Sequence, residues 1–193
     1  MEIIQREKPK IVFGGILYEA KRPRKEQLLR WIYGNKREAI PVEIRKKTPN
    51  KNALTSNLLV KTTIFIKYPF DDAITKYGYE DLCFLSVLES NEISVTHIEN
   101  PTYHLNLETS LQFLIKIAIE NLALLIESKK IAKQNSRLFS SYVILRKLKL
   151  TTPFGFLFNK TEGKITTNLL SQNPSVFLFD LFKLGYLCKI KNV

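Results

Sequence analysis

Residues 57–84 read NLLVKTTIFIKYPFDDAITKYGYEDLCF, and the order of elements in this stretch decides the fold class. The apolar run at 56–60 predicts a strand, and residues 61–67 that follow it predict a short helix. A turn rich in proline and aspartate comes next. A second helix is then expected to begin at residue 79 or 80 and to run to about 89, with an apolar inward face. This order predicts a mixed α/β fold.

The residues on either side extend the same pattern. Residues 11–18 (IVFGGILY) form an apolar run that suits a buried strand, and the two glycines indicate close approach of another backbone. Helical spacing predicts a helix over residues 25–33 that stops at the Gly34-Asn35 pair. Residues 40–52 are basic, contain two prolines and predict an ordered or semi-mobile loop, and such loops often close over ligands. Residues 93–98 alternate as a strand does.

The pattern changes near residue 108. Amphipathic helices are predicted over 108–129 and 134–149, and a last helix begins at Asn173-Pro174, because proline fits the first helical turn. We therefore divide the chain into a mixed α/β domain at 1–107 and a basic amphipathic helical extension at 108–193.

Composition places the chain among globular proteins with a basic surface. Its 193 residues are 45% hydrophobic and carry a net charge of +12. The charge is concentrated in residues 21–51 and in residues 128–160, and the second zone contains eight basic residues and no acid. A solvated face explains such zones, and so does attraction to the phosphates of lipids or nucleotides. Aromatic residues between the charges favour attraction to lipid headgroups at a membrane over attraction to nucleotides.

Cellular location is predicted from the cysteines and the apolar runs. Cys83 and Cys188 lie in apolar stretches and are expected to be buried, reduced thiols. The charged N-terminus does not resemble a secretory signal. Residues 111–126, the most apolar stretch, contain charged side chains and are too short to span a bilayer. We expect a cytoplasmic protein, and contact with the inner face of the cytoplasmic membrane stays open.

Two short motifs in the opening stretch resemble a known family. The turn Phe70-Asp71-Asp72 and the helix start Gly78-Tyr79-Glu80-Asp81 are similar to the second half of the GT-A fold in family 2 glycosyltransferases of bacterial type. There, a strand and a short helix lead to a Phe-Asp-Glu-like turn and then to Gly-x-Glu-Asp. The commonest family form has a second glycine where this chain has Tyr79. The resemblance covers residues 8–107 and, more loosely, the helical tail.

The resemblance implies roles for the acidic pair. An inverting transfer needs a base that takes the proton from the acceptor hydroxyl as that hydroxyl attacks the anomeric carbon. In the family this base corresponds to Asp81, and Glu80 corresponds to the residue that holds an acceptor hydroxyl. Gly78 and Tyr79 would shape the acceptor pocket. Both acids are expected in the first turn of a helix, where the helix dipole favours carboxylates, and a purely structural role at that dipole is the alternative.

Two further residues lie at positions similar to those of functional residues in the family. His104 lies near the position of a family histidine that completes the metal site, whereas His97 is expected to pack or to face solvent. Trp31 lies in a segment similar to one that precedes the acceptor loop, so it is a candidate for stacking on a sugar. A core tryptophan on an amphipathic helix is the alternative.

The family's nucleotide-binding strand–helix–strand unit and its Asp-x-Asp motif, which holds Mg²⁺ or Mn²⁺, have no counterpart here. The resemblance therefore implies the C-terminal portion of a glycosyltransferase, with a separate or lost N-terminal half. By itself the chain would be inactive, would bind no metal, and would expose the edge of the 11–18 strand. The complete enzyme would transfer sugar from a nucleotide-sugar donor to a saccharide or lipid-linked acceptor in cell-surface polysaccharide synthesis.

A non-catalytic basic module is the alternative function. It would bind nucleic acid or an anionic membrane surface, and Glu80 and Asp81 would then be dispensable. The chain contains no recognised nucleic-acid motif, so we expect no nucleic-acid partner.

Overall fold

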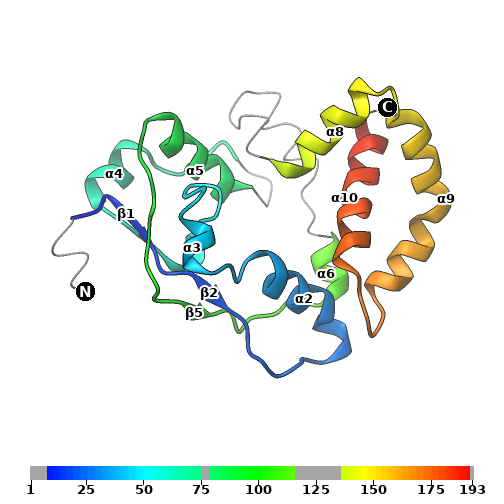
Figure 1. The fold of residues 1–193 in the computed structure, drawn as a ribbon, viewed down its shortest axis with the longest axis horizontal. Coiled ribbons are helices and arrows are strands. Elements are labelled where there is room, and N and C mark those ends of the chain that lie inside the picture. The colour runs from blue at the N-terminus through cyan, green and yellow to red at the C-terminus, as the bar shows by residue number, and fades with distance from the viewer. Residues whose placement is uncertain (1–7, 75–78, 116–135, 192–193) are drawn as a thin grey trace. The chain divides into compact units, whose positions relative to one another are not determined.

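The computed structural model describes residues 8–74, 79–115 and 136–191 (Figure 1). The chain is mixed helix and strand with small sheets. By its internal contacts it divides into two compact units. The first contains the described residues of 1–19, 34–75 and 80–105, and the second contains those of 20–33, 76–79 and 106–193. The division at residue 107, proposed from the sequence, stays a prediction.

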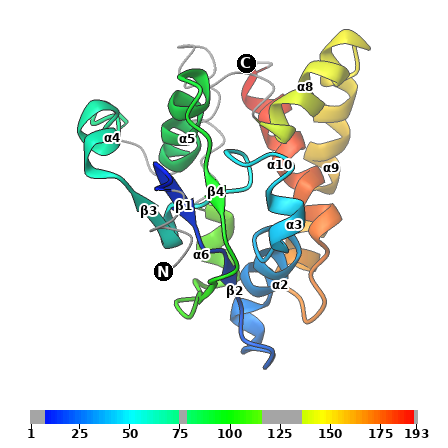
Figure 2. The ribbon, with the colours of Figure 1, turned by 60° about the vertical axis from the view of Figure 1, so that its left-hand side comes forward.

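A three-stranded sheet organises the first unit. Its central strand is β1 (Ile11–Phe13), which pairs antiparallel with β3 (Leu58–Val60) and parallel with β4 (Thr96–His97). Figure 2 shows these three strands side by side. A second, two-stranded parallel sheet joins β2 (Ile16–Leu17) to β5 (Thr102–Tyr103).

The predicted strand at 11–18 is confirmed, but the glycines split it into β1 and β2. A Cβ at Gly14 would overlap the carbonyl oxygen of Asn100, and Gly15 has a φ of 98°, a conformation that favours glycine. All three residues of β1 are buried. The expected exposed edge at this strand is therefore wrong, because β1 has a partner on both sides.

Two of the four short elements around the sheet follow the sequence closely. The first unit contains η2 (Thr55–Asn57), α3 (Val42–Arg45), α4 (Thr62–Lys67) and α5 (Glu80–Ser90). Both α4 and α5 lie where the periodicity predicts them, whereas α3 lies in the predicted loop and η2 shortens the predicted strand at 56–60 to residues 58–60. The strand expected over 93–98 is present only as the two residues of β4.

One predicted helix end is wrong. After η1 (Lys25–Gln27), helix α2 (Leu28–Arg37) continues through the Gly34-Asn35 pair that was expected to stop it. Gly34 serves close packing instead, because a Cβ at this position would overlap the ring of Tyr18. The Tyr18 hydroxyl also donates a hydrogen bond to Glu38 just beyond the helix.

The second unit is helical. It contains α6 (Ser110–Ile115), α8 (Arg137–Lys147), α9 (Thr151–Leu169) and α10 (Val176–Lys191), and α9 packs along α10 (Figure 1). Its core contains buried side chains from four helices, namely Leu29, Leu114, Leu169 and Phe179. The predicted helices at 134–149 and after Asn173 are confirmed, and much of the one at 108–129 lies outside the described residues. Helix α9 was not predicted.

Both cysteines are buried, free thiols, as expected. Within the described ranges, none of the helices combines the length and the apolar character needed to cross a bilayer.

Candidate functional site

The acidic pair Glu80-Asp81 forms the start of α5, as the sequence predicts. Asp81 is partly buried, and it accepts hydrogen bonds from the hydroxyl and the backbone N–H of Thr55. Burial raises the pKa of Asp81, the hydrogen bonds from Thr55 oppose this shift, and the adjacent charge of Glu80 adds to it. A carboxylate whose pKa is raised accepts a proton more readily, which suits a general base.

Glu80 contributes a buried oxygen to the same turn. Among the atoms that the structure describes, its Oε2 has no hydrogen-bond partner. A buried carboxylate oxygen without a partner is costly, and such groups concentrate at functional sites. The first turn of α5 therefore carries two consecutive acids, one that is hydrogen-bonded to Thr55 and one with a buried oxygen that has no partner among the described atoms.

A pocket of about 320 Å³ opens beside this turn. Its walls come from η2, β3, α4, α5 and the turn after α4, and the lining residues are Thr55, Leu58, Val60, Thr62, Phe65, Phe70 and Phe84. The rings of Phe70 and Phe84 stack with centroids 4.6 Å apart. Thr55 both lines the pocket and donates hydrogen bonds to Asp81, so one residue connects the carboxylate to the pocket wall.

The other predicted site residues divide between the two units. Tyr79 belongs to the second unit and has a φ of 68°, a backbone conformation that favours glycine. Burial raises the pKa of the Tyr79 hydroxyl. Trp31 is partly buried on α2 in the second unit, and Gly78 lies outside the described residues. The structure brings Glu80 and Asp81 together in the first unit.

His104 follows β5. Its backbone N–H donates to the carbonyl of Leu17 at 2.8 Å, which extends the pairing of β5 with β2. The imidazole lies against the ring of Tyr18, with centroids 5.4 Å apart. In the part of the chain that the structure covers, there is no group of three His, Cys, Asp or Glu side chains able to hold a metal ion.

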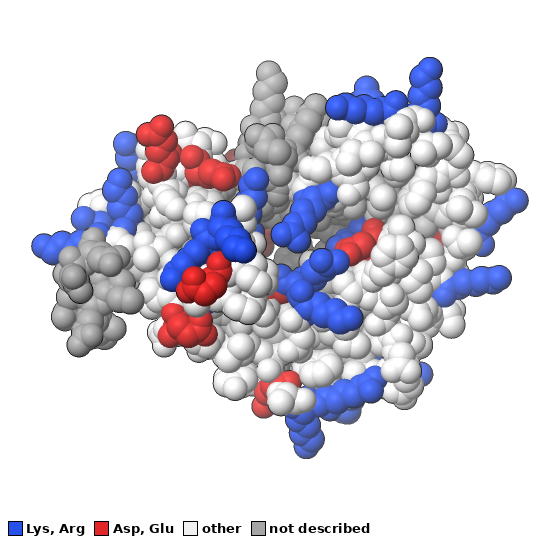
Figure 3. Space-filling model, in the orientation of Figure 1, with Lys and Arg blue, Asp and Glu red and all other residues white. Residues whose placement is uncertain are grey.

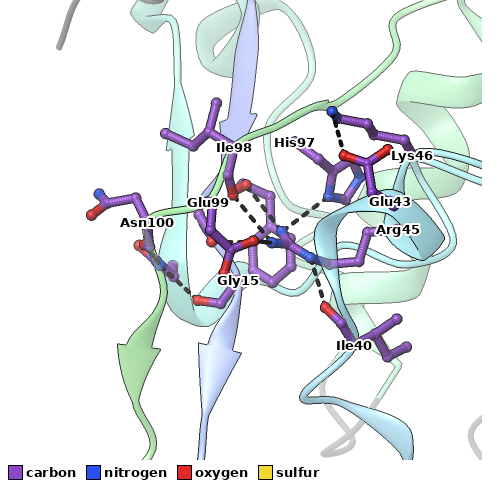
Figure 4. A network of polar contacts seen from close by, with 12 residues as sticks. Gly15, Ile40, Glu43, Arg45, Lys46, His97, Ile98, Glu99 and Asn100 are labelled. Atoms are coloured by element: carbon purple, nitrogen blue, oxygen red, sulfur yellow. Dashed lines mark hydrogen bonds and ion pairs between the residues drawn. The ribbon is translucent and has the colours of Figure 1, made fainter.

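A second polar cluster is centred on Arg45, in the segment expected to be an ordered or semi-mobile loop. The Arg45 side chain is almost completely buried, at 1% exposure, and its guanidinium lies over the ring of Phe13. Figure 4 shows this group between the loop and the strands. It donates to four backbone carbonyls at 2.9–3.3 Å, those of Phe13, Gly14, Ile40 and Ile98.

The Arg45 cluster attaches residues 40–52 to the sheet, and we call this segment the strap. Glu99 lies 3.6 Å from the guanidinium and forms an ion pair with it (Figure 4). Asn50 adds a second attachment, because its amide donates to the carbonyls of Leu85 and Ile93 and its oxygen accepts from the N–H of Val95. We interpret this cluster as structural, since its donors are already occupied.

His97 completes the Arg45 cluster, so of the two expected alternatives it packs and does not face solvent. Its Nε2 lies 2.8 Å from the carbonyl oxygen of Pro49, so Nε2 carries the proton and Nδ1 accepts from the Arg45 guanidinium at 3.3 Å. Burial lowers the pKa of His97, and the charges of Arg45 and Lys46 lower it further, against the opposing effect of the Pro49 carbonyl.

This arrangement predicts an acid-sensitive fold. The folded pKa of His97 lies below that of the unfolded chain, so unfolding takes up a proton and stability is lost as pH falls below about 6.5. We expect the urea midpoint of the wild type to decrease between pH 7.5 and pH 5.5. His97→Gln should remove part of this decrease, and His104→Gln should retain it. Identical pH dependence in the wild type and both variants would contradict the assignment.

Sequence reasoning identified the acidic pair but missed Thr55, the aromatic pocket and the role of Arg45. The aromatic residues of the motif stretch were a usable signal for the pocket, because Phe84 follows Asp81 by one helical turn. No local pattern distinguishes Arg45 from the lysines beside it. Comparison with protein-family models, curated proteins and solved structures finds no match for this chain.

Proposed function

We propose that this chain carries the acceptor-activating part of an inverting glycosyltransferase of the family 2 type, with a GT-A-like arrangement in residues 1–107. One observation carries the proposal. Asp81, a carboxylate with a raised pKa in the first turn of α5, is hydrogen-bonded to a residue that also lines a pocket of about 320 Å³. The resemblance of the Phe70-Asp71-Asp72 and Gly78-Tyr79-Glu80-Asp81 motifs supplies the reaction class.

In the proposed reaction an acceptor hydroxyl attacks the anomeric carbon of a nucleotide sugar. A carbon–oxygen bond forms on the acceptor, the bond to the diphosphate breaks, and the nucleoside diphosphate leaves with the electron pair. The hydroxyl proton passes to Asp81. Glu80 has a buried oxygen without a partner among the described atoms, and it would hold another hydroxyl of the acceptor.

The conformation of Tyr79 supports the resemblance. The family's commonest form has glycine at this position, and the φ of 68° found here is one that favours glycine. Gly78, Tyr79 and Trp31 are proposed to contact the acceptor. His104 is proposed as a metal ligand in the complete enzyme, where Mg²⁺ or Mn²⁺ would neutralise the diphosphate.

The donor is proposed to bind to a nucleotide-binding half that supplies the Asp-x-Asp motif, with the assembled enzyme acting at the inner face of the cytoplasmic membrane. Calorimetry tests this division of labour. We expect no binding of UDP or GDP to the chain alone, with or without Mn²⁺. Micromolar affinity in the presence of Mn²⁺ would overturn the division and place a donor site within the chain.

Acceptor binding can be tested with the chain as it is. Titration of the ¹⁵N-labelled protein with a panel of oligosaccharides and lipid-linked sugars should shift the amide signals of Thr55 and Asp81. Asp81→Asn should weaken the response, whereas Lys51→Gln, an exposed change in the same unit, should not. A panel that leaves the signals of η2 and α5 unmoved would contradict the proposed acceptor site.

The hydroxyl of Thr55 is predicted to tune the base. Its hydrogen bond lowers the pKa of Asp81 against the effect of burial, so Thr55→Val should raise that pKa further. Titration of the ¹³C-labelled carboxyl group by NMR measures the change directly. Thr55→Ser keeps the hydroxyl and should titrate like the wild type. A valine variant with an unshifted Asp81 would show that this hydrogen bond does not set the pKa.

A further inference from the structure

The second unit presents an unusual surface where α8 meets α9. Helix α8 ends at Lys147, Lys149 has a φ of 58°, and α9 begins at Thr151. The N–H of Leu150 donates to the carbonyl of Leu145 at 2.8 Å, which closes a tight corner. Residues 146–150, Arg-Lys-Leu-Lys-Leu, are all exposed at this corner.

Helix α9 continues this surface along one side. Its buried residues Gly155, Phe158 and Leu169 face inward, and the ring of Phe158 fills the space above Gly185 of α10. The opposite side carries Phe156 and Leu157, which are 62% and 58% exposed. These two large apolar side chains lie on the side of the helix where polar residues are the rule, because the helix already packs on its other side.

Basic and apolar side chains alternate over this surface. We call it the basic apolar face. Its apolar members are Ile144, Leu148, Leu150, Phe156 and Leu157, all large and exposed. Its basic members are Arg146, Lys147, Lys149, Lys160 and Lys164, all exposed. Figure 3 shows Lys and Arg side chains over the α8–α9 corner and along α9, with uncharged surface between them.

The charges on this face are available to a partner. Glu162 is the acid nearest in sequence, and it is engaged with Lys189 of α10 at 3.5 Å. The ammonium of Lys160 lies over the ring of Phe156, 4.4 Å from its centroid, so a cation and an apolar ring are presented together. A surface that offers positive charge and insertable apolar side chains together matches the headgroup region of an anionic membrane.

We propose that the basic apolar face binds the surface of an anionic lipid bilayer, with the lysines on the headgroups and Leu148, Phe156 and Leu157 in the acyl boundary. Charge complementarity selects this occupant over a second copy of the chain, because two such faces would repel each other. The exposed apolar side chains favour a bilayer over nucleic acid, because phosphate groups of nucleic acid do not bind leucine side chains. This inference does not use Glu80 or Asp81, and it stands or falls independently of the proposed glycosyl transfer.

Vesicle flotation of the full chain tests the proposal. Vesicles of phosphatidylcholine with about one third phosphatidylserine should bind the protein in low salt, and vesicles of phosphatidylcholine alone should not. Binding should fall steeply when the salt is raised above physiological strength. Reversing three charges, Lys147→Glu with Lys149→Glu and Lys160→Glu, should reduce partitioning by roughly a hundredfold.

A matched control distinguishes the effect of the charges on this face from the effect of the overall net charge of the protein. Lys47→Glu with Lys51→Glu and Lys61→Glu makes the same charge change at exposed sites of the first unit and should retain most of the binding. Equal losses in the two triple variants would overturn the assignment to this face. So would equal binding to neutral and anionic vesicles, or displacement from vesicles by stoichiometric single-stranded DNA or RNA.

Insertion has its own readout. Trp31 is the chain's one tryptophan, so Phe156→Trp adds a single reporter on the proposed face. Brominated acyl chains should quench the new tryptophan, and they should leave the Trp31 emission of the wild type largely unchanged. Phe156→Ser with Leu157→Ser should weaken binding to anionic vesicles. A Phe156→Trp reporter that lipid does not quench, or a concentration-dependent dimer that buries it in the absence of lipid, would contradict membrane insertion.

Discussion

Arg45→Met is expected to destabilise the first unit by about 3–5 kcal/mol, the range found when a buried charge cluster loses one partner. Methionine fills much of the space of the arginine side chain but donates no hydrogen bonds. Four backbone carbonyls would lose their donor, and Nδ1 of His97 would lose its partner as well. Among the described residues, the strap at 40–52 would then keep only the hydrogen bonds of Asn50 and the one between the Pro49 carbonyl and Nε2 of His97.

Hydrogen exchange of the β1 amides, followed in increasing urea, measures this loss in the unit concerned. Lys46→Met is the matched control, because Lys46 is exposed and its 3.1 Å ion pair with Glu43 is worth at most about 1 kcal/mol. Arg45→Lys should fall between the two variants, since lysine keeps the charge but lacks the planar fork of donors. An Arg45→Met protein within about 1 kcal/mol of the wild type would show that the cluster contributes little to stability.

Arg45 also illustrates which features of the fold could not be predicted from the sequence. In the basic, proline-containing segment 40–52, the arginine and its neighbouring lysines look alike. Only contacts with residues such as Phe13 and Ile98, far away in the sequence, separate the buried side chain from the solvated ones. How this segment is attached to the sheet could not be predicted, because local sequence patterns do not reveal tertiary hydrogen bonds.

The same limit explains the errors in the helices. Glycine commonly ends a helix, yet Gly34 lies inside α2. A glycine is found there because any side chain at this position would overlap the Tyr18 ring. Helix α9 contains Pro153, Gly155 and Gly163, which suggest a loop. Proline is tolerated there because it lies in the first turn, and Gly155 is buried. Strong local signals, such as the apolar run of β1 and the acidic start of α5, predicted their elements correctly.

The candidate site was predictable to a similar extent. The position of Glu80 and Asp81 at a helix start follows from the sequence, because carboxylates favour the first turn. The partner Thr55 does not, since it lies on a separate element and reaches Asp81 only in the folded chain. The raised pKa of Asp81 depends on that burial and on those hydrogen bonds, so the property most relevant to catalysis belongs to the tertiary structure.

Asp81→Asn provides the sharpest test of the proposed chemistry. In the assembled enzyme, with a nucleotide-binding half supplied, the variant should release nucleoside diphosphate about 10²–10⁴-fold more slowly than the wild type, because an amide cannot take the acceptor's proton. Its carbonyl can still accept the hydrogen bonds of Thr55, so the geometry of the turn should be kept. Glu92→Gln, an exposed change just after α5, is the control for loss of an acid and should retain full activity.

Although Asp81→Asn should lower activity, it should not lower the stability of the protein. The raised pKa means that folding disfavours the ionised form of Asp81, so near neutral pH its charge lowers the free energy of unfolding. Asparagine carries no charge at this position, and we expect Asp81→Asn to be at least as stable as the wild type in thermal unfolding. A variant that is slow and stable identifies Asp81 as the base, since natural active sites often sacrifice stability for function. Near-normal turnover would remove Asp81 from the mechanism, and a large loss of stability would make it a structural residue of the α5 start.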